Sequence, residues 1–178
     1  MQSRTKIIDA NHADTAIRSA RILIAADEFT ARKGMRTLLL SMGVIDVHEA
    51  PDGASALAAI AVRDPDVVIL DWQLAGMNGP EFVRRLRASD QFSRPNVPII
   101  MLTSHGEPAR VIEAMRLGVH EFLVKPVSDR ALYERIASAL LKAAVPRRAV
   151  SRPTVAESHV VAAGRAGASL GSTRRSRI

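Results

Sequence analysis

The chain of 178 residues contains no cysteine. This excludes a disulfide framework and any metal site built on thiolates. Long apolar runs are also missing from the first 20 residues, so the sequence predicts neither a secretory signal peptide nor a membrane-spanning helix there. We therefore expect a soluble, cytoplasmic protein that does not insert into a membrane.

Positive charge is unevenly distributed along the chain. The first 145 residues carry 18 Lys and Arg against 17 Asp and Glu, whereas residues 146–178 carry seven Arg against Glu157 alone. Residues 145–178 lack aromatic side chains and a sustained apolar period, so we expect a disordered basic tail. A solubilising role is favoured over specific nucleic-acid binding, because no aromatic side chain is present to stack on bases.

The remaining length suits one folded domain, which we assign to residues 21–144, after an irregular or weakly helical leader over residues 1–20. Five short apolar segments in this domain are predicted strands, and five segments with helical periodicity alternate with them. The predicted strands are Arg21–Ala26, Val44–Ala50, Val67–Leu70, Ile99–Leu102 and Glu121–Val124. The alternation predicts an α/β fold, a doubly wound parallel sheet with helices on both faces.

Some details of these elements can also be predicted. The run Val67–Leu70 is continuously apolar, which is typical of a central strand, whereas Val44–Ala50 alternates imperfectly and suits an edge. Thr30 and Ser128 are placed to cap the first and last helices. Helical periodicity places Arg87 on a water-facing side of its helix.

Polar side chains stand where four of the predicted strands end. These are Asp27, followed by Glu28, and then Asp71, Thr103 and Lys125. In a parallel sheet the carboxyl ends share one edge, where ligands bind. Two nearby carboxylates repel each other unless a cation intervenes, and hard oxygen ligands suit Mg²⁺. With a hydroxyl and an ammonium group added, the site could hold Mg²⁺, a carboxylate nucleophile and phosphoryl oxygens.

Over residues 21–144 the sequence strongly resembles the receiver domain of two-component response regulators. Five segments carry the resemblance: ILIAADE (22–28), APDGASAL (50–57), PDVVILDWQLAGMNG (65–79), PIIMLTS (98–104) and EFLVKP (121–126). The resemblance implies a flavodoxin-like (βα)5 fold with strand order 2-1-3-4-5. It also implies a signalling domain that is no conventional enzyme, beyond promoting its own phosphotransfer and dephosphorylation.

The resemblance implies roles for particular residues. Asp71 would be the phosphoacceptor, and Mg²⁺ would be bound by Asp27, Asp71 and the backbone carbonyl of Gln73. Thr103 and Lys125 would contact the phosphoryl group, and Lys125-Pro126 would be a cis peptide. Phe122 would be an aromatic switch residue, although packing in the core explains an aromatic side chain there equally well.

The resemblance also implies partners. A histidine kinase or a histidine phosphotransfer protein would supply the phosphoryl group. A downstream protein would contact the face formed by the fourth helix, the fifth strand and the fifth helix, and a homodimer is also compatible with this face. Phosphorylation would shift a two-state equilibrium through Thr103 and Phe122.

One position departs from the pattern of the family. Ala26 stands where the first of two adjacent acids is usual, and Glu28 matches a common third acid rather than the missing one. The departure motivates a second hypothesis, an interaction module that works without phosphorylation. A third hypothesis, an aspartyl-phosphate phosphatase of the haloacid dehalogenase type, predicts an acid two residues after Asp71. Gln73 stands there, so this hypothesis ranks last.

Overall fold

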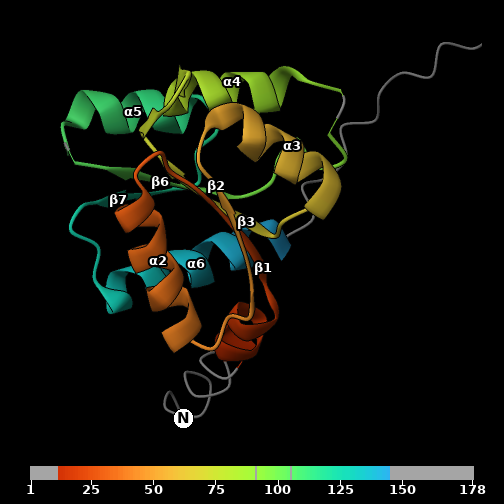
Figure 1. Cartoon of the computed structure of the whole chain (residues 1–178), viewed down its shortest axis with the longest axis vertical. Coiled ribbons are helices and arrows are strands. Elements are labelled where there is room, and N and C mark those ends of the chain that lie inside the picture. The colour runs from red at the N-terminus through yellow and green to blue at the C-terminus, as the bar shows by residue number, and fades with distance from the viewer. Residues whose placement is uncertain (1–11, 91, 105, 145–178) are drawn as a thin grey trace, which may run out of the picture. The chain divides into compact units, whose positions relative to one another are not determined.

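The computed structural model describes residues 12–144 apart from residues 91 and 105 (Figure 1). Within them, five parallel strands form one sheet in the order β2-β1-β3-β6-β7. Their bounds are Arg21–Ala25 for β1, Asp46–Ala50 for β2, Val67–Asp71 for β3, Ile99–Thr103 for β6 and Glu121–Val124 for β7. The predicted doubly wound parallel sheet is therefore confirmed, as is the strand order implied by the resemblance.

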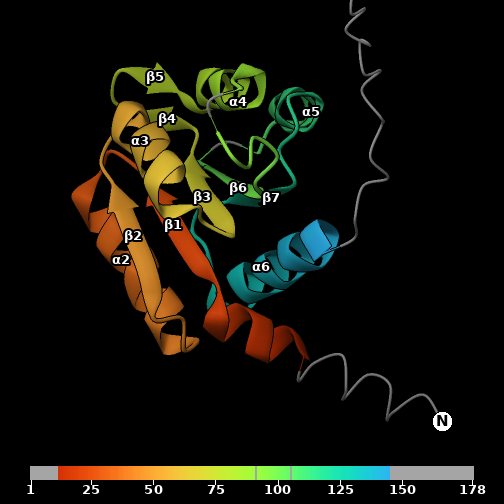
Figure 2. The same cartoon turned by 90° about the vertical axis from the view of Figure 1, so that its right-hand side faces the viewer.

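Helices cover both faces of the sheet (Figure 2). They are α2 (Phe29–Ser41), α3 (Gly53–Arg63), α4 (Gly79–Ala88), α5 (Pro108–Arg116) and α6 (Asp129–Ala144). Apolar side chains of α3, α4 and α5 pack on one face, and those of α2 and α6 pack on the other. Because the sheet is covered on both sides, every residue of the central strands β3 and β6 is buried.

The segment before β1 is helical, which is one of the two alternatives expected for the leader, but it packs on the folded domain. Residues 12–19 are helical, and the side chain of Ile17 is completely buried in the core that α6 and β1 share. The hydroxyl of Tyr133 in α6 donates a hydrogen bond to the Asp14 carboxylate, at 3.0 Å. The domain therefore begins before residue 21. The sequence left a helix here open but did not predict its packing on the domain, because isolated Ile residues in a polar stretch create no apolar period.

One of the two predicted helix caps is wrong. Helix α2 begins at Phe29, with Glu28 at the cap position and no hydrogen bond from a capping side chain. The Thr30 hydroxyl instead donates to the Glu28 carboxylate, at 2.6 Å. The Ser128 cap is confirmed, since its hydroxyl oxygen accepts a hydrogen bond from the backbone N–H of Ala131 at 3.3 Å.

The prediction for Arg87 is also wrong. Its guanidinium is half-buried and donates hydrogen bonds to three backbone carbonyls, those of Pro95, Val97 and Gly118. These carbonyls lie before β6 and after α5, so one side chain of α4 joins two connecting segments. Helical periodicity indicates where a Cβ atom lies, whereas the long Arg side chain can turn back towards the protein.

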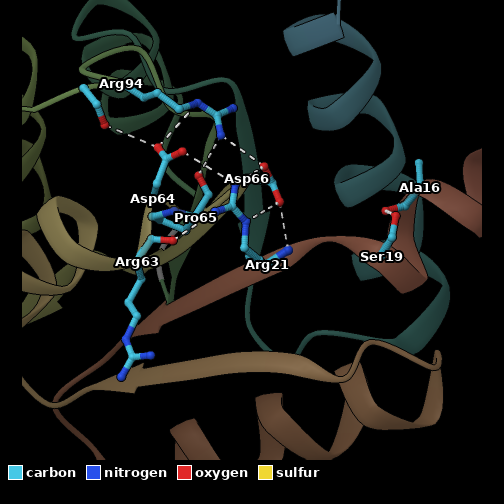
Figure 3. A network of polar contacts seen from close by, with 9 residues as sticks. Ala16, Ser19, Arg21, Arg63, Asp64, Pro65, Asp66 and Arg94 are labelled. Atoms are coloured by element: carbon cyan, nitrogen blue, oxygen red, sulfur yellow. Dashed lines mark hydrogen bonds and ion pairs between the residues drawn. The ribbon is translucent and has the colours of Figure 1, made fainter.

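A network of polar side chains lies at the amino ends of the strands (Figure 3). Asp71 and Thr103 lie at the opposite, carboxyl ends. The Asp66 carboxylate precedes β3 and accepts hydrogen bonds from the Arg21 guanidinium at 3.1 Å and from Arg94 at 3.0 Å. The backbone N–H of Arg21 also donates to Asp66, at 3.0 Å. Asp64, in the left-handed conformation with φ 45°, forms a longer ion pair with Arg21 at 3.6 Å.

This network gives a prediction for acid stability. Burial by itself would raise the pKa of Asp66, but hydrogen bonds from the side chain and backbone of Arg21, and from Arg94, outweigh it and lower the pKa. Because the pKa in the folded state lies below the unfolded value of about 3.9, the stabilisation is present above that pH and is lost as the pH falls through the folded pKa. The free energy of unfolding in urea should therefore fall with acidification below about pH 4.

The matched control for this prediction is Asp66→Asn, which removes the titrating group and keeps the shape of the side chain. The variant should be less stable near neutral pH, and its loss of stability on acidification should be smaller than that of the wild type. Equal slopes for the two proteins would contradict the assignment of this stabilisation to Asp66.

The predicted tail, residues 145–178, and the first 11 residues lie outside the described part of the chain. Among the helices of residues 12–144, none is both long enough and apolar enough to cross a membrane.

Candidate functional site

The polar residues that follow the strands lie together at the carboxyl edge of the sheet. Asp71 ends β3 and Thr103 ends β6. Lys125 directly follows β7, and Asp27 lies two residues after the end of β1. The register aligns these ends, since Asp71 pairs with Leu102 and Thr103 pairs with Val124. They border one cavity of about 140 Å³, lined by Asp27, Glu28, Asp71, Trp72, Gln73, Thr103, Ser104, Arg110 and Lys125. All the predicted polar residues of the site are therefore neighbours.

Asp71 is a buried acid with a cationic partner. Its side chain is 8% exposed, and the ammonium group of Lys125 donates a hydrogen bond to its Oδ2 atom. The backbone N–H of Gln73 donates weakly to Oδ1, at 3.4 Å. The ion pair with Lys125 offsets part of the cost of removing the Asp71 carboxylate from water, and its second oxygen remains available to the cavity.

The backbone holds Thr103 and Lys125 close to each other. The N–H of Lys125 donates a hydrogen bond to the carbonyl of Thr103, at 2.8 Å, which extends the pairing of β6 with β7 by one residue. Lys125-Pro126 is a cis peptide, as the resemblance implied. The Thr103 side chain is buried, and that of Lys125 is 29% exposed. A hydroxyl and an ammonium group therefore lie at the same end of the cavity.

The loop after Asp71 turns tightly back on the strand. Residues Gln73–Leu74 (β4) and Met77–Asn78 (β5) pair antiparallel, with Gly76 at φ 78° between them. A Cβ atom on Gly79 would lie 3.1 Å from the carbonyl oxygen of Asp71. Glycine therefore suits position 76, where φ is positive, and position 79, where the chain passes close to the Asp71 backbone. These two glycines allow the loop that carries Gln73 to fold back on the strand.

The oxygen ligands of the cavity fit Mg²⁺. Asp27 and Asp71 could supply carboxylates and Gln73 a backbone carbonyl, since all three residues line the cavity, while the Glu28 carboxylate accepts a hydrogen bond from the Thr30 hydroxyl. Across residues 12–144, with 91 and 105 left aside, no three His, Cys, Asp or Glu side chains cluster so that they alone could hold a metal. Mg²⁺ commonly binds through one or two carboxylates and keeps several waters, so this set suits a hydrated Mg²⁺ ion.

Ala26, at the position where the resemblance implies an acid, lies next to this set. Its side chain is buried, and its backbone N–H donates to the carbonyl of Ala50 at 3.2 Å. It borders a second, mostly apolar cavity of about 220 Å³ that also reaches Asp71 and Lys125. The position therefore adjoins the site, and there is space beside it for a larger side chain.

One aromatic ring, that of Trp72, lines the cavity, and a second ring lies against it. Trp72 and Phe122 contact each other edge to face, with ring centroids 6.4 Å apart and an interplanar angle of 72°. Both are half-buried and pack against the core under α3, α4 and α5. Packing thus accounts for Phe122 in this conformation, and its role as a switch stays a prediction.

Sequence reasoning missed Arg110 and Ser104, which also line the cavity. Ser104 follows Thr103 directly, so adjacency could have indicated it. Arg110 lies in α5 with its guanidinium 5.4 Å from the centre of the Trp72 ring. Nothing in the sequence marks Arg110, because it enters the cavity from a helix rather than from a strand end.

Known proteins share this fold and sequence pattern. The family model described as response regulator receiver domain matches residues 22–137. Chemotaxis protein CheY1 of Helicobacter pylori is 36% identical over 117 residues, which cover 65% of this chain and 93% of that protein. Chemotaxis protein CheY-3 of Vibrio cholerae is 32% identical over 119 residues, which cover 67% of this chain and 90% of that protein.

Solved structures agree with these sequence matches. Chemotaxis response regulator CheY4 of Vibrio cholerae has a TM-score of 0.62 at 31% identity, covering 68% of this chain and 98% of that one. The receiver domain of Francisella response regulator 1452 has a TM-score of 0.63 at 26% identity, covering 70% of this chain and 99% of that one. With the strand order and the grouping of acids, hydroxyl and lysine at one sheet edge, these matches show that the chain belongs to the response regulator receiver domain family.

Proposed function

We propose that Asp71 accepts a phosphoryl group from the phosphohistidine of a histidine kinase or phosphotransfer protein. The observation that carries this proposal is the buried Asp71 carboxylate, paired with Lys125 and open to a polar cavity. One carboxylate oxygen would form a bond to phosphorus while the bond from phosphorus to the imidazole nitrogen breaks. That nitrogen would keep the electron pair, and the histidine returns to its neutral form.

The other residues would stabilise the charge that the phosphoryl group brings. The Lys125 ammonium group lies against Asp71 and would exchange one carboxylate oxygen for a phosphoryl oxygen. The Thr103 hydroxyl, buried at the end of β6, would donate to a second oxygen. Mg²⁺, when held by Asp27, Asp71 and the Gln73 carbonyl, would shield the negative charges of carboxylates and phosphoryl group from one another.

The signal would then pass to another protein through the face formed by α5, β7 and α6. Large apolar side chains of these elements are 47–63% exposed, among them Met115, Val124 and Leu141. Strand β7 of this face contains Phe122 and Val124, and Val124 pairs with Thr103 of the site. A movement of Thr103 would therefore act directly on a strand of the face. A downstream protein or a second copy of the chain could cover these apolar side chains.

A second candidate function is an interaction module that works without phosphorylation. Ala26 favours it, because the missing carboxylate would otherwise help to order the water around Mg²⁺. The two candidates differ in Mg²⁺ affinity and in phosphorylation. Intact-mass measurement after incubation with acetyl phosphate, with and without Mg²⁺, separates them: one Mg²⁺-dependent phosphoryl group supports the first, and an unmodified protein supports the second.

Ala26→Asp is expected to tighten Mg²⁺ binding. A carboxylate at position 26 would lie beside Asp27 and Asp71 and could anchor the hydration shell of the ion, and the adjoining cavity has space for it. Titration calorimetry with MgCl₂ on the wild type and the variant measures the effect, with Ala26→Asn as the uncharged control. A variant that binds Mg²⁺ as weakly as the wild type, or more weakly, would contradict this account of Ala26.

A further inference from the structure

Arg110 combines three features that the proposed phosphotransfer does not yet use. It lines the cavity of Asp71, its guanidinium lies 5.4 Å from the centre of the Trp72 ring, and its side chain is 33% exposed. Its hydrogen bond to Glu107, from Nε to Oε2 at 3.0 Å, joins residues three apart on the surface of α5. Such exposed pairs are weak, so an anion in the cavity could replace Glu107 at small cost.

The guanidinium also has donors to spare. Among the described residues, Nε is the one side-chain atom of Arg110 for which a hydrogen bond is observed. The two Nη groups together carry four further N–H donors in the planar arrangement that matches two oxygens of a phosphoryl group. The Trp72 ring supports the guanidinium from one side, so less side-chain freedom is lost when these donors bind.

The charges of the cavity show why such a residue matters here. Three carboxylates line it, those of Asp27, Glu28 and Asp71, against the two cations Lys125 and Arg110. Lys125 is already paired with Asp71. A phosphoryl group adds more negative charge to this set, and among the described residues of the cavity wall Arg110 is the cation that remains to bind it.

We propose that Arg110 is a phosphoryl-binding residue of this receiver domain, whose Nη groups donate to phosphoryl oxygens on Asp71 and to those of an incoming phosphodonor. The inference rests on the proposed function, because it assumes that phosphate chemistry takes place at Asp71. Arg110 would add a guanidinium from α5 to the Lys125 ammonium group and the Thr103 hydroxyl at the strand ends. Binding would move the guanidinium relative to Trp72, which is the sole tryptophan of the chain.

The test measures beryllofluoride, a phosphoryl-like anion, and Mg²⁺ separately by calorimetry on the full chain. For Arg110→Gln we expect roughly tenfold weaker beryllofluoride binding, as expected for a lost hydrogen bond between charged groups. We expect Mg²⁺ binding that is no weaker than in the wild type, because a neighbouring cation has been removed. Arg110→Lys, which keeps the charge but loses the planar donors, should fall between. Arg116→Gln, in the last turn of the same helix, is the matched control and should bind both ions normally.

Trp72 fluorescence supplies an independent measurement. Beryllofluoride should change the emission of the wild type, and the change should be much smaller in Arg110→Gln. Equal beryllofluoride affinities for Arg110→Gln and Arg116→Gln would overturn the inference about Arg110 but leave the proposed function standing. A parallel loss of Mg²⁺ and anion binding in Arg110→Gln would also overturn it, because such a loss indicates structural damage. A wild type that binds no beryllofluoride and gains no phosphoryl group from acetyl phosphate would overturn the proposed function and the inference together.

Discussion

Asp71→Asn is expected to gain no phosphoryl group from acetyl phosphate and Mg²⁺ under conditions in which the wild type gains one. The amide keeps the shape of the side chain but has no carboxylate oxygen that can attack phosphorus. Since the loss is one of chemistry rather than of binding, labelling should be abolished rather than reduced. Intact-mass measurement of both proteins, after the same incubation, checks the prediction.

The control for this experiment is Asp66→Asn, the same change at a half-buried acid that directly precedes β3 and pairs with Arg21. It should still be labelled, even though it is less stable. If Asp71→Asn is labelled as fully as the wild type, another side chain accepts the phosphoryl group, and the assignment of Asp71 as phosphoacceptor is wrong.

Arg87→Met is expected to produce the largest loss of stability among the substitutions considered. Methionine keeps the apolar stem but removes the donors to the carbonyls of Pro95, Val97 and Gly118. Part-buried carbonyls that lose a charged donor must be hydrated or left unpaired, and we expect a cost of about 2–4 kcal/mol. This corresponds to a fall of roughly 10 °C in the midpoint of thermal unfolding.

Arg85→Met provides the matched control, since it removes the same charge from the same helix. The Arg85 side chain is 57% exposed and pairs with Glu81 one turn earlier, an interaction of small net value. Urea unfolding of the two variants should give a clear loss of stability for Arg87→Met and a small one for Arg85→Met. Similar losses would show that the carbonyl contacts of Arg87 contribute little.

The sheet and the positions of the main site residues could be predicted from sequence for physical reasons. A central parallel strand must be apolar on both faces, and this continuous pattern marked β3 and β6. Asp71 ends such a run, and Thr103 and Lys125 end or follow two others, so the geometry of a parallel sheet alone brings the three together.

The remaining features depend on side chains that reach across the fold. Ile17 is buried because α6 lies beside it, and Arg87 turns to carbonyls that are distant in sequence. Arg110 reaches the cavity because its helix packs near Trp72. In each case the sequence around the residue is compatible with an exposed side chain. The side chain turns inward because of neighbours that are distant in sequence. Local pattern carries no information about such neighbours.

The most direct test of the central claim is to locate the phosphoryl group in the wild-type chain. After incubation with acetyl phosphate and Mg²⁺, borohydride reduces an aspartyl phosphate to homoserine, and peptide mass spectrometry then identifies the altered position. We expect homoserine at position 71 and an unaltered Asp27. Homoserine at another position, or an unmodified peptide around residue 71 from a fully folded protein, would contradict it.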